Sequence, residues 1–103
     1  MFLARNWVYT LNNPTVTLEE ANAALREINS FLFHACQLER GESGTLHIQG
    51  YVQFSRPIRF TQLTARLMGA HWEIRRGSHQ QALAYVTKDE SRVSGPFYYL
   101  QPQ

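Results

Sequence analysis

Two side chains that can bind a metal project from one predicted strand, because His47 and Gln49 lie in the alternating stretch Leu46–Phe54. Residues two apart on a strand point to the same face, so the imidazole and the amide are neighbours. Glu39 precedes the turn before this strand, and a hairpin would place it beside one strand end. A carboxylate, an imidazole and an amide oxygen together suit Mg²⁺ or Mn²⁺. The alternative stays open, because a single His-x-Gln pattern also suits a solvated strand face.

A second pair with possible chemistry is Tyr85 and Lys88, three residues apart in a predicted helix and therefore on one helix face. A tyrosine hydroxyl, with a pKa of about 10, needs help to act as a nucleophile. Lys88 offers positive charge to the phenol or to a phosphate oxygen. Packing of Tyr85 and a surface position for Lys88 would explain the same spacing, so the pair alone decides nothing.

Positive charge gathers in the second half of the chain. This asymmetry suits phosphate contacts, with Trp7, Tyr9 or Tyr51 available to stack on bases, although a solvated surface over an aromatic core explains it equally well. The basic residues are Arg56, Arg59, Arg66, Arg75, Arg76, Lys88 and Arg92.

Length and composition narrow the protein class. The 103 residues suffice for one domain with a modest core. Cys36 is the only cysteine, which excludes a disulfide framework and a thiolate metal cluster. No apolar run approaches the roughly 20 residues of a membrane span, and no phosphate-loop signature is present. We therefore expect neither a membrane partner nor nucleotide hydrolysis.

The elements that must position these residues alternate between strand and helix. Strands are predicted at Asn6–Leu11, Phe33–Glu39, Leu46–Phe54 and His71–Arg75, and helices from Leu18 to about Asn29 or Phe31, Gln62 to Met68 and His79 to about Lys88. This order predicts a single α+β domain over residues 1–103, with an antiparallel sheet of about five strands flanked by helices, ferredoxin-like or RNA-recognition-like in plan. We expect an ordered core at about residues 4–90, a C-terminal extension over residues 91–103 that starts as a loop, a structural His34 and an exposed His79.

Three motifs, in this order, resemble the replication-initiator (Rep) proteins of small circular single-stranded DNA viruses, and most of all those of circoviruses and nanoviruses. They are Tyr9–Pro14, the His-x-Gln pattern in His47–Tyr51, and the Tyr-x-x-Lys pattern of Tyr85–Lys88. Trp72–Gly77 and Gly95–Phe97 are also similar to that group. The resemblance covers nearly the whole chain.

The resemblance implies an HUH endonuclease that cuts and rejoins single-stranded DNA at a viral origin. Glu39, His47 and Gln49 would hold one divalent ion, Mn²⁺ or Mg²⁺, that polarises the scissile phosphate. Tyr85 would attack the phosphorus, release a 3′-OH and keep the 5′ end as a phosphotyrosine. Lys88 would position or neutralise the site. Reversal would rejoin the strands, because the covalent link conserves the bond energy.

The resemblance also implies partners and a location. Full-length relatives carry a helicase domain, work in rolling-circle replication and act in the host cell nucleus; we expect the isolated domain to be a monomer. The candidate DNA contacts are Asn6, Tyr9, Thr10, Asn12, Tyr51, Arg56, Arg75 and Arg76.

Some points depart from the family pattern or stay open. Many HUH enzymes have a second histidine where this chain has Gln49, and an amide is the weaker ligand, so we expect lower metal affinity and a preference for Mn²⁺ over Zn²⁺. Glu42 competes with Glu39 as the carboxylate, and we favour Glu39 because it ends a strand. The alternative function is a non-catalytic module of the same fold that binds single-stranded nucleic acid. No glycine-aromatic ribonucleoprotein signature supports that alternative.

Overall fold

A computed structural model describes residues 3–102, so the ends of the predicted domain 1–103 lie outside the described residues. Within this range the strands are β1 (Leu3–Asn12), β2 (Phe31–Arg40), β3 (Leu46–Arg59), β4 (His71–Ile74) and β5 (Arg92–Leu100), and the helices are α1 (Leu18–Arg26), α2 (Phe60–Arg66) and α3 (His79–Val86). The strands form one antiparallel sheet in the order β4-β1-β3-β2-β5. The predicted five-stranded α+β fold is confirmed. None of the described helices is long and apolar enough to cross a membrane.

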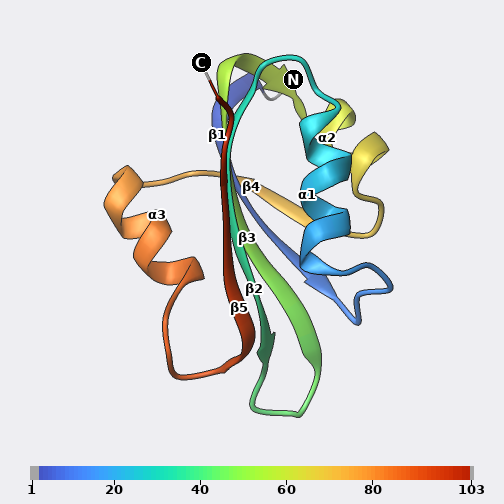
Figure 1. Cartoon of the computed structure of the whole chain (residues 1–103), viewed down its shortest axis with the longest axis vertical. Coiled ribbons are helices and arrows are strands. Elements are labelled where there is room, and N and C mark those ends of the chain that lie inside the picture. Colours follow the sequence, from blue (N-terminus) through green and yellow to red (C-terminus); the bar gives the residue numbers. More distant parts are fainter. Residues whose placement is uncertain (1–2, 103) are drawn as a thin grey trace.

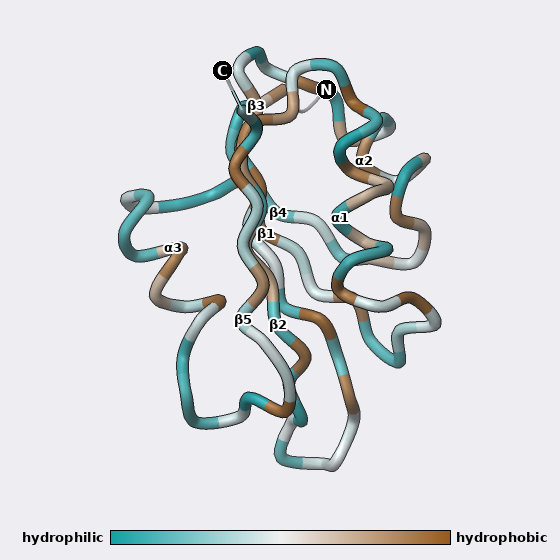
Figure 2. The backbone as a smooth tube through the Cα atoms, viewed as in Figure 1, coloured by the Kyte–Doolittle hydropathy of each residue, from teal (hydrophilic) through white to brown (hydrophobic). Residues whose placement is uncertain are grey.

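Helices cover both faces of the sheet. Helices α1 and α2 lie against one face, and α3 lies alone against the other (Figure 1). The segments that lead into and out of α3 are largely hydrophilic, as Figure 2 shows. This arrangement makes the α3 face the one on which a helix and polar strand residues can meet.

The larger core lies between the sheet and the pair α1 and α2. Alternate residues of β1 and β3 build it, because period-two alternation sends them to one face. They include Trp7, Tyr9, Leu11, Ile48, Val52 and Phe54, and Trp72 of β4 joins them. A smaller cluster under α3 consists of Ala35, Tyr51, Ala82 and Val86. Both sheet faces are therefore partly covered, whereas alternation alone predicted one polar face.

Gly50 of β3 leaves room for the ring of Tyr9 on the neighbouring strand β1. Tyr9 and Gly50 are partners in the β1–β3 register, and a Cβ at position 50 would lie 2.1 Å from Cε1 of Tyr9. Only glycine leaves room for this ring, since real Cβ atoms do not approach a ring so closely. The close approach fixes the direction of the Tyr9 hydroxyl.

The Tyr9 hydroxyl belongs to a buried series of side-chain hydrogen bonds. It donates to Nε2 of His34 over 2.9 Å, and Nδ1 of His34 donates to Oδ1 of Asn22 on α1 over 2.9 Å. This pairing requires a neutral imidazole with its proton on Nδ1. Burial lowers the pKa of His34 to about 3, which keeps the ring neutral. The prediction that His34 is structural is confirmed.

Mild acid should destabilise this fold through His34. The pKa of His34 falls from 6.5 to about 3 on folding, so only the unfolded chain gains a proton as the pH drops below about 6.5. From pH 7 to pH 5 the free energy of unfolding should fall by about 2 kcal/mol from this residue, measurable by urea unfolding. His34→Gln should flatten this pH dependence, whereas His71→Gln, whose native side chain is 72% exposed, should retain it. An unchanged pH dependence in His34→Gln would refute the assignment.

Strand β5 corrects the prediction for the C-terminal part. Residues 91–96 were expected as a loop outside an ordered core, but Arg92–Leu100 pairs with β2 along the sheet edge. The pairing includes a register irregularity beside Leu38, and Gly95 there has φ +101°. Edge strands accept proline and glycine at such irregularities, so the Gly95-Pro96 pair did not stop the strand.

Candidate metal and nucleophile site

The β2–β3 hairpin brings the predicted metal-binding residues together on the α3 face. Glu39 pairs with His47 in the register, and the adjacent pair on the same face is Gln37 with Gln49. Nε2 of His47 lies 3.1 Å from Oε1 of Glu39. Glu42 is exposed in the turn after β2, so the geometry agrees with Glu39 as the carboxylate.

Gln49 is held by the neighbouring strand β1. Its side chain is 5% exposed, its Nε2 donates to the Tyr9 carbonyl over 3.0 Å, and its Oε1 accepts from the Thr10 hydroxyl over 3.0 Å. These contacts fix the direction of the amide and leave one lone pair of Oε1 for another partner. Thr10, predicted as a DNA contact, thus supports Gln49 in this structure.

The Glu39 carboxylate is buried but keeps its charge. Only 2% of the residue is exposed, and the Lys88 ammonium donates to Oε1 and Oε2 over 2.9 and 2.8 Å. Burial raises the pKa of Glu39, but hydrogen bonds from Lys88 and Gln37, the Lys88 charge and a bond from His47 lower it more. The net pKa lies below its usual value, so the group is an anion at neutral pH.

Tyr85 reaches this site from α3. Its ring is 54% exposed, and Nζ of Lys88 lies 4.3 Å from the ring centroid. The Lys88 ammonium therefore lies within contact distance of both the Glu39 carboxylate and the Tyr85 ring. A small cleft of about 210 Å³ also joins Tyr85 to Gln49, with Thr10 and Glu73 among its lining residues.

The start of α3 is anchored on the centre of the sheet by Tyr51. The Tyr51 hydroxyl accepts from Arg75 and is hydrogen-bonded to Nδ1 of His79, each over 2.8 Å. Ser78 caps the helix by accepting from the Gln81 backbone, and Gln81 caps Ser78 in return. His79 is half-buried, so its predicted exposure is wrong. The anchor fixes where Tyr85 emerges, seven residues beyond the Ser78 cap.

The donors at this site fit a hard or borderline divalent cation. Residues 3–102 contain no cluster of three or more His, Cys, Asp or Glu side chains suited to a metal, which argues against a zinc-type site. An anionic carboxylate, an imidazole and an amide oxygen instead match Mg²⁺ and Mn²⁺. The Lys88 ammonium already forms an ion pair with the Glu39 carboxylate and balances its charge. The residues therefore fit the expected ion, which would have to displace Lys88 from at least one oxygen of Glu39.

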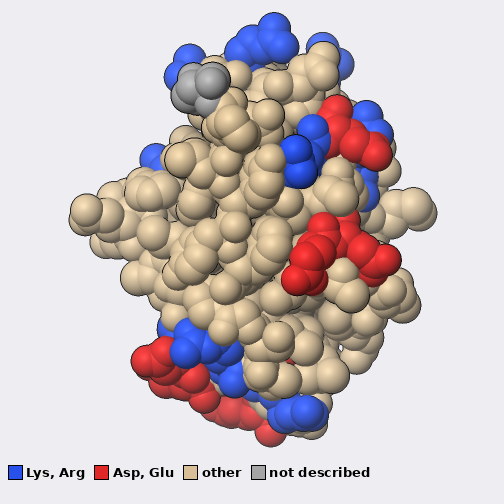
Figure 3. Space-filling view, viewed as in Figure 1, with Lys and Arg blue, Asp and Glu red and all other residues tan. Residues whose placement is uncertain are grey.

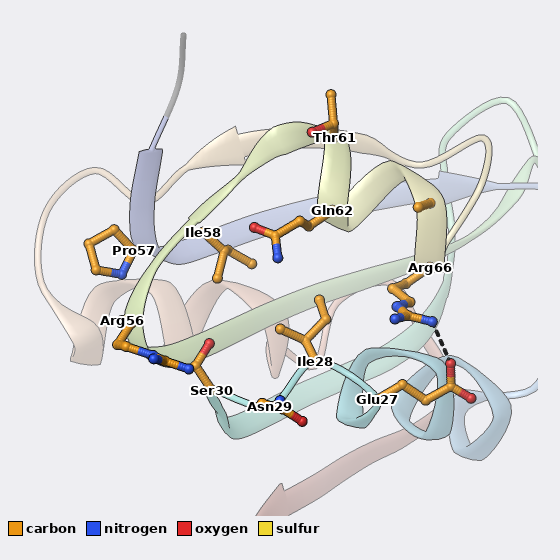
Figure 4. A pocket seen from close by; sticks show the side chains of 11 residues that line it. Glu27, Ile28, Asn29, Ser30, Arg56, Pro57, Ile58, Thr61, Gln62 and Arg66 are labelled. Carbon is orange, nitrogen blue, oxygen red and sulfur yellow. Dashed lines mark hydrogen bonds and ion pairs between the residues drawn. The ribbon is translucent and has the colours of Figure 1, made fainter.

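The predicted DNA contacts do not form one surface. Trp7, Tyr9 and Tyr51 are at most 2% exposed, so the hypothesis that they stack on bases is wrong. Arg75 is engaged with Tyr51. Arg56 lies elsewhere, in a cleft of about 640 Å³ lined by residues 27–30 just after α1, by the end of β3 and by α2 (Figure 4). In the view of Figure 3, Lys and Arg lie mainly toward both ends of the molecule. DNA contacts at Asn6, Asn12 and Arg76 stay predictions.

Sequence reasoning missed two features beside the site. Gln37 donates to Oε2 of Glu39 over 2.7 Å, and period-two spacing before Glu39 was a usable signal for it. His71 and Glu73 on β4 pair over 2.9 Å and line the Tyr85 cleft. Their nearness to Tyr85 depends on the β1–β4 pairing, for which no local pattern exists.

Residues 4–89 match the sequence model of a family described as putative viral replication protein. The chain belongs to this family. It is 42% identical over 93 residues to the master replication protein of Subterranean clover stunt virus, covering 90% of this chain and 30% of that protein. It is 41% identical over 90 residues to the replication-associated protein of Canary circovirus, covering 87% of this chain and 31% of that protein.

A further relative is the master replication protein of Banana bunchy top virus, 37% identical over 93 residues, with 90% of this chain and 30% of that protein covered. The chain spans about a third of the length of these relatives. The resemblance to replication proteins of nanoviruses and circoviruses is confirmed, and a role in viral replication is supported.

Proposed function

We propose that this domain is a metal-dependent, sequence-specific endonuclease and strand-joining nucleotidyltransferase that acts on single-stranded DNA at a viral replication origin. It would start and end rolling-circle replication. The observation that supports this most is the place of Lys88, whose ammonium contacts both the Glu39 carboxylate and the Tyr85 ring. One side chain therefore contacts both a candidate metal ligand of the sheet and the candidate nucleophile of α3.

In this proposal Glu39, His47 and Gln49 hold Mn²⁺ or Mg²⁺, which supplies Lewis-acid polarisation of a phosphate oxygen. The Tyr85 phenol oxygen attacks the phosphorus and loses its proton. The bond from phosphorus to the 3′ oxygen breaks, and that oxygen takes up a proton and leaves as a 3′-OH. The 5′ end stays on Tyr85 as a phosphodiester, and the reverse attack rejoins two strands.

Lys88 contributes by its charge in this reaction. Its ammonium lies 4.3 Å from the Tyr85 ring centroid, close enough to stabilise a phenolate or the phosphate oxygens facing it. The half-exposed Tyr85 leaves access for a strand, while the anchored start of α3 limits the positions the ring can take. The proposed partners are single-stranded origin DNA and a helicase domain in the full-length protein, in the host nucleus, with the isolated domain a monomer.

A covalent-adduct experiment tests the proposal without knowledge of the origin. The protein is incubated with Mn²⁺ and a pool of single-stranded oligonucleotides with randomised centres, then separated on a denaturing gel. A 3′ label should travel with the protein and a 5′ label should leave with the released strand. EDTA should abolish the product, and sequencing of attached strands should give one site. Binding without any covalent product, unaffected by EDTA, would favour the non-catalytic module instead.

A further inference from the structure

The two oxygens of Glu39 have different neighbours, apart from Lys88, which contacts both. Oε1 lies 3.1 Å from Nε2 of His47. Oε2 accepts from Nε2 of Gln37 over 2.7 Å. One oxygen thus faces the neighbouring candidate ligand, and the other is taken by an amide that no motif includes.

Gln37 links the carboxylate to the segment that carries the nucleophile. Its Nε2 also donates to the Lys88 carbonyl over 2.9 Å, just beyond the end of α3. The residue is fully buried, with 0% exposed. A single amide nitrogen therefore joins the Glu39 carboxylate of β2 to the chain that follows Tyr85.

The direction of the Gln37 amide is determined by its neighbours. If the amide were turned over, its oxygen would face Oε2 of Glu39 and the Lys88 carbonyl, which are both acceptors. Strand β5 closes the space from the other side, because a Cβ at Gly95 would lie 3.1 Å from Cβ of Gln37. Gly95 also has φ +101°, so the close cover over Gln37 depends on glycine there.

Gln37 carries one further sign of a polar site. Its Oε1 is buried and accepts no hydrogen bond from any described residue. Leaving a buried carbonyl oxygen without a hydrogen bond is unfavourable, so a purely structural role does not explain a glutamine at this position. An apolar residue would fill the same space without that cost. The donor function of Nε2 toward Glu39 explains why a glutamine stands here.

We propose that Gln37 is a positioning residue that makes Glu39 bind the cation through Oε1 alone and thereby selects the ion; this inference rests on the proposed function. Outer hydrogen bonds to a metal-binding carboxylate fix its orientation. With Oε2 held by Gln37, the carboxylate offers one oxygen on the His47 side. Single-oxygen binding suits the octahedral preference of Mg²⁺ and Mn²⁺, whereas Ca²⁺ accepts both oxygens of a carboxylate and more ligands.

The affinities of the wild-type protein and a Gln37 variant for Mn²⁺ and Ca²⁺ test this ion selection directly. Isothermal titration with Mn²⁺ and with Ca²⁺ should show that Gln37→Met binds Mn²⁺ about tenfold more weakly or worse. Its Ca²⁺ affinity should stay the same or rise, because Oε2 loses the Gln37 hydrogen bond and keeps only its contact with Lys88. The ratio of the two affinities should therefore change by about tenfold or more in favour of Ca²⁺. Gln53→Met, at a half-buried glutamine of β3 that pairs with Phe33 and not with Glu39, is the matched control and should bind as wild type.

Three results would overturn the inference. Unchanged Mn²⁺ affinity in Gln37→Met would remove Gln37 from the site, and an equal loss for both ions would mean that its role is structural support. If thermal unfolding shows that Gln37→Met does not fold, Gln37→Thr, which suits a strand, should show the same ratio change. Wild-type protein that binds neither ion would overturn the proposed function as well, so the two failures are distinguishable.

Discussion

Tyr85→Phe should abolish the covalent protein–DNA product, to below the detection limit of a denaturing gel. Phenylalanine lacks the oxygen that attacks phosphorus, while its ring can keep the contact with the Lys88 ammonium, 4.3 Å from the centroid. The side chain is 54% exposed, so the free energy of unfolding should change by less than about 0.5 kcal/mol. Mn²⁺ affinity and single-strand binding should remain, because the predicted ligands are untouched.

Tyr98→Phe is the matched control for this loss. Tyr98 has the same exposed fraction, 54%, but lies on edge strand β5. It should form the covalent product at the wild-type rate. A 3′-labelled adduct in Tyr85→Phe would assign the nucleophile to another side chain, and a loss in both variants would point to a general effect of removing surface hydroxyls.

Local patterns determined much of the fold, because the signals that decide a helix start or a strand lie within a few residues. Thr17 with Glu20, and Ser78 with Gln81, have the three-residue spacing of a capping box, and both capping boxes form in the structure. The alternation in β3 placed His47 and Gln49 on one face, and the hairpin turn placed Glu39 opposite His47. The predicted metal residues were therefore accessible to sequence reasoning.

What was missed depends on contacts between distant segments. Strand β5 forms because β2 offers an edge to it, and its own Gly95-Pro96 pair reads as a loop when taken alone. Tyr51 was placed on an open polar face, since period-two alternation does not show that α3 covers it. The same limit applied to Lys88, whose partner Glu39 lies 49 residues away in the chain. The Tyr-x-x-Lys motif implied only that Lys88 positions or neutralises the site, and the structure shows that Lys88 contacts Glu39.

Under the proposed function, that contact would make Lys88 a competitor of the metal ion as well as a group that assists Tyr85. The ammonium donates to both oxygens of Glu39, so an ion that binds the carboxylate must displace it at least from Oε1. Displacement costs the stabilisation of the pair, and the cost is greater because Glu39 is buried. Metal binding would thus free the Lys88 charge at the moment when a phosphate and Tyr85 need it.

Lys88→Met should therefore bind Mn²⁺ about tenfold more tightly than wild type, a gain of about 1.4 kcal/mol, while the yield of covalent product falls. The metal-free variant should be less stable by about 2 kcal/mol, since removing Lys88 leaves the buried Glu39 charge without its partner. Mn²⁺ should recover that loss, which thermal unfolding with and without the ion measures.

Arg66→Met is the control for simple loss of positive charge, because Arg66 lies on α2, across the sheet from α3 (Figure 1), and pairs with Glu27. It should leave Mn²⁺ affinity within about twofold of wild type, since the exposed Arg66–Glu27 pair lies on the other face of the sheet and its charges are screened. Weaker Mn²⁺ binding in Lys88→Met would contradict the competition and mean that Lys88 holds Glu39 in place for the ion. Opposite changes in metal affinity and product yield are what separate the two roles of one side chain.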